Sequence, residues 1–166
     1  SKDIFRRVQH KVLPGSSNDL KVIEVAVEEK PTGEIAAGAG VGSEGASFMF
    51  SLKENNYLGK GLQVETSINT SQSAIRGGLN ITNPNYNYSG NSLYGGINST
   101  RNDSEESGYE NTITQLNIGT RFEQYDDIYL SPNISAGFDD LRVDSTASES
   151  LKKQAGDFTE FYFGYG

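Results

Sequence analysis

Few residues in this sequence have the types and spacing that catalysis or cofactor binding requires. Gly40 to Gly45 matches the G-x-G-x-x-G pattern of dinucleotide-binding loops, but such a loop must open a helix. The residues that follow, Ala46 to Lys53, alternate as a strand does. His10 is the only histidine, and it lies far in sequence from any plausible nucleophile, so a Ser-His-Asp site would be hard to build from it. The sequence therefore predicts neither an enzyme nor a bound cofactor.

Metal and nucleic-acid sites are also disfavoured. Acidic side chains gather at three strand ends: Asp126-Asp127, Asp139-Asp140 and Asp103/Glu105/Glu106. Carboxylates of this kind can bind calcium, but the EF-hand pattern is missing, so we expect solvated loops and no metal. The absence of cysteine excludes a disulfide scaffold and thiolate metal sites. A formal charge of −8 with no basic stripe disfavours nucleic acid as a partner.

The elements that would carry any site are strands, because hydrophobic side chains recur at every second position. Such alternation gives each strand one apolar and one polar face. We expect eight antiparallel strands from about Gly33 to the C-terminus, and the one short helical candidate is Ser148 to Gln154. The clearest apolar faces are Phe48/Phe50/Leu52, Leu62/Val64/Ile68, Ile75/Leu79/Ile81, Leu116/Ile118/Phe122, Ile128 to Phe138 as one strand, and Phe161/Phe163/Tyr165.

The connections between these strands sort by length. Compact turns rich in Asn, Tyr and Gly alternate with connections that grow along the chain. Short turns on one side and longer polar loops on the other are typical of an outer-membrane barrel. Tyr57, Tyr86 and Tyr125 are expected to form an interfacial aromatic girdle at the short-turn side. The compact turns are Asn55–Gly59, Thr82–Tyr86 and Glu123–Asp127, and the growing loops are Gly42–Gly45, Thr100–Glu110 and Asp139–Asp157.

The first thirty residues have a different pattern. Ile4–Leu13 and Leu20–Lys30 are two predicted strands, joined by a turn-rich segment from Pro14 to Asp19. A hairpin of this size is too small to fold alone. Pro31-Thr32-Gly33 makes the boundary with the strands that follow.

Alternation alone does not separate a soluble β-sandwich from a membrane barrel, since the second is the first turned inside out. Three features favour the barrel: polar faces that suit a wet lumen, strands of around ten residues, and the parity of the connections. Arg76 and Arg121 are predicted to point inward, where they could pair with Glu65 or Glu160 or simply be hydrated.

Four motifs occur in an order that resembles BamA-type outer-membrane assembly factors. The resemblance is strong from about Val25 to Tyr94, and beyond that it lies mainly in pattern and loop parity. The motifs are Val25–Gly33, similar to the end of the last POTRA domain; Ala37–Gly45, similar to the first barrel strand and loop; Glu54–Gly61, similar to the first periplasmic turn; and Ile81–Tyr86, similar to the Thr-Asn-Pro-aromatic segment after the fourth strand.

The resemblance implies an antiparallel transmembrane β-barrel of sixteen strands in the cell outer membrane. Residues 32–166 would form its N-terminal half, and residues 1–31 would be the C-terminal hairpin of a POTRA domain in the periplasm. The remaining strands and the sixth loop with its Arg-Gly motif are absent, so we expect a fragment. The family folds and inserts β-barrel proteins, and its partners are unfolded outer-membrane proteins, accessory outer-membrane lipoproteins and membrane lipid.

The resemblance also assigns roles to particular residues. In the family, the first barrel strand pairs weakly with the last and leaves a lateral gate for substrate strands. The small side chains of this strand agree with that role, although small residues also fill crowded barrel interiors. The gate strand would comprise Glu34, Ile35, Ala36, Ala37, Gly38, Ala39 and Gly40. The periplasmic-turn motifs would comprise Asn56, Tyr57, Leu58, Gly59, Asn83, Pro84 and Tyr86.

Other functions stay open at this point. A passive porin or transport barrel would use the polar lumen itself. Translocation relatives, such as TamA or two-partner-secretion transporters, share the layout of hairpin and barrel. A soluble β-sandwich binding module is the third class, and it would not depend on detergent.

Overall fold

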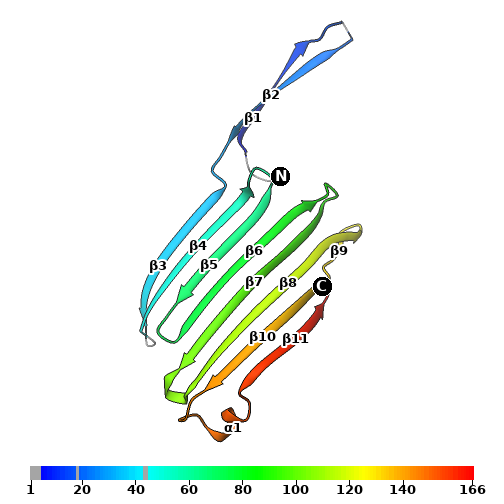
Figure 1. The fold of residues 1–166 in the computed structure, drawn as a ribbon. Coiled ribbons are helices and arrows are strands. Elements are labelled where there is room, and N and C mark those ends of the chain that lie inside the picture. The colour runs from blue at the N-terminus through cyan, green and yellow to red at the C-terminus, as the bar shows by residue number, and fades with distance from the viewer. Residues whose placement is uncertain (1–4, 18, 43–44) are drawn as a thin grey trace.

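The chain folds into two antiparallel sheets in a computed structural model that describes residues 5–17, 19–42 and 45–166 (Figure 1). The smaller sheet is the hairpin of β1 (Phe5–Pro14) and β2 (Lys21–Glu29). This hairpin agrees with the predicted one, although Ile4 and Asn18 of the prediction lie outside the described residues. The hairpin ends before Gly33, where the large sheet begins.

The large sheet is a meander in which strands follow one another in chain order. The strand pairings among the described residues are antiparallel, which confirms the predicted all-β class with eight long strands. The long strands are β3 (Gly33–Gly42), β4 (Gly45–Tyr57), β5 (Leu62–Thr70), β6 (Ala74–Tyr86), β7 (Asn91–Ser104), β8 (Tyr109–Tyr125), β10 (Asn133–Val143) and β11 (Gly156–Gly164); the short β9 (Ile128–Leu130) pairs with β8.

Helix is scarce in the described residues. A single turn of α-helix, α1 (Glu149–Lys152), falls inside the predicted Ser148–Gln154 candidate. A 3₁₀ turn, η1 (Glu105–Ser107), links β7 to β8. No helix in the described part of the chain is long and apolar enough to cross a membrane.

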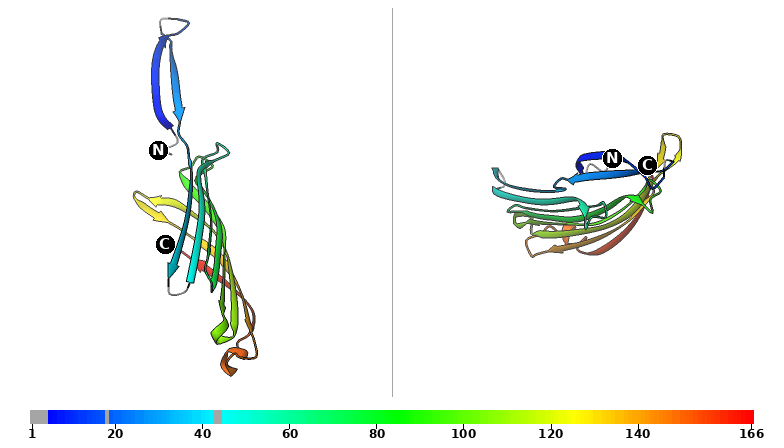
Figure 2. Two further views of the ribbon diagram at one scale, coloured as in Figure 1. Left: turned by 90° about the vertical axis from the view of Figure 1, so that its left-hand side faces the viewer. Right: turned by 90° about the horizontal axis from the view of Figure 1, so that it is seen from above.

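The large sheet is a single curved layer, seen as a trough from above (Figure 2). Nothing is stacked on either face, so in the described residues Ala147 is the one buried hydrophobic side chain. Large apolar groups instead lie in the open: Phe48 is 58% and Phe161 is 75% exposed. Contiguous apolar surface of this extent marks a membrane or protein contact in place of an interior core.

Cross-strand register shows which side chains share a face, because directly paired residues point the same way. One face, here called the outer face, is apolar. On β6 its members Ile75, Leu79 and Ile81 are exposed, whereas Gly78 and Asn80 on the opposite, inner face are half-buried. This difference places the inner face on the concave side. One row across the outer face reads Ala39, Phe48, Thr70 and Ile75; another reads Ile97, Leu116, Ala136 and Phe161.

The connections lie at two ends of the sheet, as their parity predicts. The turns after β4, β6 and β8 lie at the end from which the β1–β2 hairpin projects, and η1 and α1 lie at the other (Figure 1). The expected strand ends were wrong by several residues. Strands β4 and β6 continue into the predicted turns, to Tyr57 and Tyr86. Ser43 and Glu44 of the first predicted loop lie outside the described residues.

The two predicted long loops are also shorter than expected. Strands β7 and β8 stay paired as far as Ser104 and Tyr109, so most of the predicted Thr100–Glu110 loop is strand. Likewise β10 reaches Val143 and β11 starts at Gly156, inside the predicted Asp139–Asp157 loop. Polar and charged residues do not stop a strand whose backbone groups find partners across a hairpin.

The predicted strand from Ile128 to Phe138 is interrupted. Its first part is β9, and the ladder resumes at Asn133 after Ser131 and Pro132. Proline has no N–H to donate to a neighbouring strand. Its carbonyl still accepts a hydrogen bond from the Thr120 N–H at 3.1 Å. Alternation of side chains continues across this break, which is why the sequence pattern did not reveal it.

Candidate functional site: the open edge at β3

Strand β3 is one edge of the large sheet. Within the described residues it pairs with β4 alone, and each of its ten residues is exposed (Figure 1). An edge strand presents a row of N–H and C=O groups that another chain can pair with. The predicted gate residues Glu34 to Gly40 all lie in this strand, so the structure brings them together on one edge.

The alternation of hydrogen-bonded residues along β3 shows which backbone groups face the open side. The Asn55 N–H donates to the Thr32 carbonyl at 3.0 Å, which makes Thr32 and Asn55 a hydrogen-bonded pair in the β3–β4 register. Hydrogen-bonded and non-hydrogen-bonded pairs alternate along an antiparallel ladder. Even-numbered β3 residues therefore bond to β4. The N–H and C=O groups of Ile35, Ala37, Ala39 and Val41 point to the open edge.

The same alternation separates the side chains of β3. Ile35, Ala37, Ala39 and Val41 lie on the outer face, in register with Leu52, Phe50, Phe48 and Ala46. The inner face of β3 carries Glu34 and then only Ala36, Gly38, Gly40 and Gly42. The open backbone groups thus belong to the residues that face outward.

Crowding by β4 does not account for every glycine of this strand. A Cβ at Gly38 would lie 3.2 Å from Met49 Cγ, a tight contact. At Gly40 the nearest atom would be Ser47 Oγ at 3.4 Å, an ordinary contact, and at Gly42 nothing would lie within 4 Å. Within the described residues, Gly42 therefore leaves open space on the inner face, and Gly40 leaves room that only the Ser47 hydroxyl borders.

The inner face of the sheet is rich in carboxamides laid over glycines. Asn98 lies over Gly78, and Asn80 lies over Gly96, so a Cβ at either glycine would collide with the carboxamide oxygen. Asn80 and Asn98 also face each other, with each Nδ2 3.5 Å from the other Oδ1. Between these strands and β10 lies a polar hollow, lined by Asn80, Asn98, Gln115, Asn117, Asn133, Ser135 and Tyr162, among others.

The short turns after β4 and β6 are two copies of one structure. In the first, the Asn56 Oδ1 accepts a hydrogen bond from the Gly61 N–H at 2.7 Å. In the second, the Asn85 Oδ1 accepts from the Gly90 N–H at 2.8 Å. Both follow Asn-Tyr-x-x-x-Gly. The Asn, Tyr and Gly content of these turns was predicted from the sequence, whereas their common spacing, although present in it, was not.

The residues before and within the turns complete the match. The side chain two positions before each asparagine accepts its N–H: Glu54 in the first turn at 2.7 Å, and Asn83 in the second at 3.1 Å. Leu58 and Gly59 have positive φ in the first turn, as Asn87 and Tyr88 have in the second. Pro84 lies where the β6–β7 register shifts, so its missing N–H breaks no ladder bond.

A register shift precedes each of the three girdle tyrosines. The shifts lie at Glu54/Tyr57, Asn83/Tyr86 and Glu123/Tyr125. Without an extra residue, strict alternation would turn each tyrosine to the inner face. With it, Tyr57, Tyr86 and Tyr125 pair with Leu62, Asn91 and Ile128 and share the outer face with them. The three tyrosines therefore line one rim of the apolar face.

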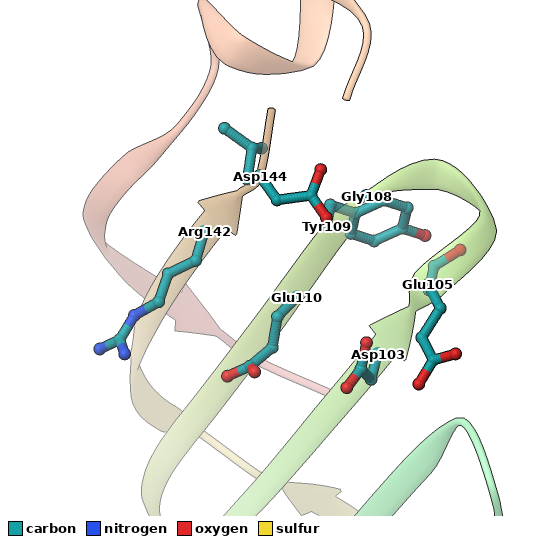
Figure 3. A pocket seen from close by; sticks show the side chains of 9 residues that line it. Asp103, Glu105, Gly108, Tyr109, Glu110, Arg142 and Asp144 are labelled. Carbon is teal, nitrogen blue, oxygen red and sulfur yellow. The ribbon is translucent and has the colours of Figure 1, made fainter. Parts of the chain in front are cut away.

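Charged residues line the opposite rim. On the outer face, Arg101 pairs with Glu110 at 2.6 Å and Arg142 with Asp140 at 2.8 Å. A hollow beside them is lined by Asp103, Glu105, Gly108, Tyr109, Glu110, Arg142 and Asp144, among others (Figure 3). No group of three metal-ligating side chains is present among the residues that the structure describes.

The loop from Asp144 to Ala155 is fastened to the β7–β8 turn. The Asp144 N–H donates to the Gly108 carbonyl at 2.9 Å, and Ala147 is 5% exposed beside it. The Asp144 carboxylate accepts hydrogen bonds from the hydroxyl and the N–H of Thr146, and these two bonds lower its pKa.

The predicted inward ion pairs do not form. Neither Arg76 nor Arg121 pairs with Glu65 or Glu160 in the described part of the chain. Arg121 instead stacks on Tyr129, with its guanidinium carbon 4.7 Å from the ring centroid. On β11, the Tyr162 hydroxyl donates to Glu160, so that carboxylate has a partner on its own strand.

A solved structure of similar fold is that of BamA from Haemophilus ducreyi, in a form lacking POTRA domains 1–3, with a TM-score of 0.74 and 19% sequence identity. The match covers 99% of this chain and 34% of the solved one, so this chain spans about a third of the length of the structure it matches. No protein-family model matches the sequence. The large sheet and its hairpin therefore have the fold of a BamA-like barrel fragment.

Proposed function

We propose that this chain is part of a machine that folds and inserts β-barrel proteins into the outer membrane, and that β3 is the edge at which an incoming strand pairs. The observation that carries the proposal is the open edge of β3 within a BamA-like barrel fold. Strand addition uses main-chain hydrogen bonds and requires no covalent chemistry. The proposal accordingly assigns no catalytic residue, cofactor or metal.

The two rims of the outer face support placement in the membrane. Tyrosine is enriched at membrane–water interfaces, and charged side chains are costly within hydrocarbon. Tyr57, Tyr86 and Tyr125 would lie at the periplasmic interface, and the Arg101–Glu110 and Arg142–Asp140 pairs at the outer one. Residues 1–31 would then form the last part of a POTRA domain in the periplasm, because the hairpin projects from the tyrosine rim (Figure 1).

The edge of β3 has the chemistry that a nonselective strand acceptor needs. Each of Ile35, Ala37, Ala39 and Val41 offers one donor and one acceptor to a new strand. An unpaired N–H or C=O in hydrocarbon costs several kcal/mol, so a strand that satisfies these groups is strongly favoured. These backbone groups stay unpaired until a client strand, or another strand of the same barrel, forms hydrogen bonds with them.

Accessory lipoproteins are proposed to bind at the short-turn end. The two Asn-Tyr turns enclose a hollow lined by Asn56, Lys60, Asn83, Asn85 and Tyr88, among others. At their tips, Leu58 is 72% and Tyr88 is 93% exposed, and both have positive φ. Exposed apolar residues held in a costly backbone conformation are favourable anchors for a partner.

A disulfide lock tests the proposed function. Cysteines would replace Ala37 and a residue of the last strand in the full-length barrel; this chain contributes no cysteine of its own. We expect the pair to cross-link readily and the locked protein to lose assembly of client barrels in reconstituted membranes, with activity restored by reduction. Failure to cross-link, or full assembly activity in the locked state, would contradict the proposal.

A passive porin or a translocation barrel is the second candidate, because the inner face carries a polar, carboxamide-lined hollow. The same lock separates it from the first. A pore conducts through its lumen and needs no open edge, so locking would leave conductance in planar bilayers unchanged. Loss of client assembly with conductance retained would favour strand pairing at β3.

A further inference from the structure

We infer that the β3 edge selects its incoming strand by side-chain size: the strand that adds there carries a long polar or aromatic residue on the lumen side, directly opposite Gly40. This inference rests on the proposed function, because it specifies which strands the same edge accepts. Three observations support it: the space over Gly40, the set of backbone groups that face the open edge, and the side chains that lie over Gly78, Gly96 and Gly119.

The hydrogen-bond phase fixes how a new strand would face. Its bonded residues must pair with Ile35, Ala37, Ala39 and Val41, which lie on the outer face. Paired residues share a face, so the new strand would turn its bonded residues to the lipid and the residues between them to the lumen. An antiparallel strand with apolar residues at the bonded positions therefore matches this edge, and one shifted by a single residue does not.

Gly40 would meet the new strand in a close pair. It belongs to the residues that bond to β4, so toward the open edge it forms a non-hydrogen-bonded pair, in which the Cα atoms lie about 4.5 Å apart. On the β4 side, Ser47 Oγ would lie 3.4 Å from an added Cβ, and no other atom of the described residues would lie within 4 Å. Gly38, one pair earlier, is already covered by Met49.

The sheet itself shows what fills such a space. The Asp103 N–H donates to the Ser73 carbonyl, which makes Gly78–Asn98 and Asn80–Gly96 non-hydrogen-bonded pairs of the same class. In both pairs a carboxamide lies over the glycine. Tyr94 also covers Gly119 between β7 and β8, in a pair of the hydrogen-bonded class. Gly40 lies at an equivalent position of the open edge, where none of the described strands supplies the opposite residue.

Disulfide trapping of strand peptides tests the inference. The full-length barrel would carry Ala39→Cys as its only accessible thiol, and each probe would be a peptide of about ten alternating residues, the length of a membrane strand. One cysteine in the peptide fixes the register opposite Ala39. The neighbouring lumen-facing residue, opposite Gly40, would be Tyr, Asn, Ser or Gly. A control peptide carries the tyrosine at a lipid-facing position instead.

We expect peptides with Tyr or Asn opposite Gly40 to be trapped about 1.4- to fivefold more than the Gly peptide, the range for one cross-strand pair. Gly40→Val should abolish or reverse this order, and Ser67→Val, on the inner face of β5 and away from the edge, should leave it unchanged. Equal trapping of all four peptides would overturn the size selection while leaving strand pairing intact. Trapping of no peptide would overturn the proposed function and the inference with it.

Discussion

At the scale of single residues, glycine does two different things in this sheet. At Gly78, Gly96 and Gly119 it makes room for a side chain from the next strand, whereas at Gly40 only Ser47 Oγ would contact an added Cβ, at 3.4 Å. Sequence alone indicated that the chain is rich in glycine and that β3 has small side chains. It did not reveal which glycines are covered. The side chain that lies over a glycine belongs to a residue about 20 positions away in the sequence, and the register of the paired strands brings the two together.

Replacing a covered glycine by alanine should destabilise the sheet, whereas the same change at an uncovered glycine should not. Gly119→Ala places a Cβ against the Tyr94 ring and 2.9 Å from the Asn133 Cβ. We expect it to lower the free energy of unfolding by about 1–3 kcal/mol, the usual cost of overpacking. Gly77→Ala is the matched control, since its nearest atom would be the Ser67 carbonyl oxygen at 3.7 Å. Urea unfolding in detergent micelles measures both, and equal effects would contradict the assignment of covered positions.

The attachment of the loop from Asp144 to Ala155 to the β7–β8 turn should weaken in acid. Hydrogen bonds from the Thr146 hydroxyl and N–H lower the pKa of Asp144 in the folded loop. A carboxyl whose pKa is depressed on folding contributes stability above its ordinary pKa and loses that contribution as pH falls through the depressed value. Hydrogen exchange at Gly108 and Ala147, corrected for its intrinsic pH dependence, should therefore accelerate in that range. Asp144→Asn should flatten the profile, and Glu149→Gln should leave it unchanged.

At the scale of elements, the turns rather than the strands decide where the aromatic rim lies. The alternation of apolar residues predicted the strands and their faces correctly. Applied strictly through the turns, the same alternation would have placed Tyr57, Tyr86 and Tyr125 on the wrong face. The register shift before each tyrosine corrects the phase, and a shift of this kind arises from pairing between strands, which a local pattern does not encode.

The two Asn-Tyr turns should respond alike to loss of their asparagine. Asn56→Ala and Asn85→Ala each remove the acceptor of a glycine N–H, and each should lower the free energy of unfolding by about 1 kcal/mol. Lys60→Ala, a neighbouring change in the first turn, should shift it by less than about 0.5 kcal/mol. Thermal unfolding in micelles compares the three variants. A large loss in one turn and none in the other would contradict their equivalence.

At the scale of the whole molecule, the protein has the polarity of a soluble sheet turned inside out. Its apolar face is convex and exposed, its polar face is concave, and tyrosines and ion pairs bound the apolar band at either end. Composition and alternation predicted this fold class, and the comparison with a solved BamA barrel confirms it. The hairpin's domain assignment, the membrane and the partners stay predictions.

The central claim is that the outer face meets lipid while the inner face meets a wet lumen, and tryptophan quenching by brominated lipid tests it most directly. The chain has no tryptophan, so Phe50→Trp on the outer face and Met49→Trp on the inner face give matched reporters one residue apart. In a full-length barrel that is otherwise free of tryptophan and embedded in brominated bilayers, we expect strong quenching at position 50 and little at position 49. Equal quenching, or stronger quenching at position 49, would contradict the account.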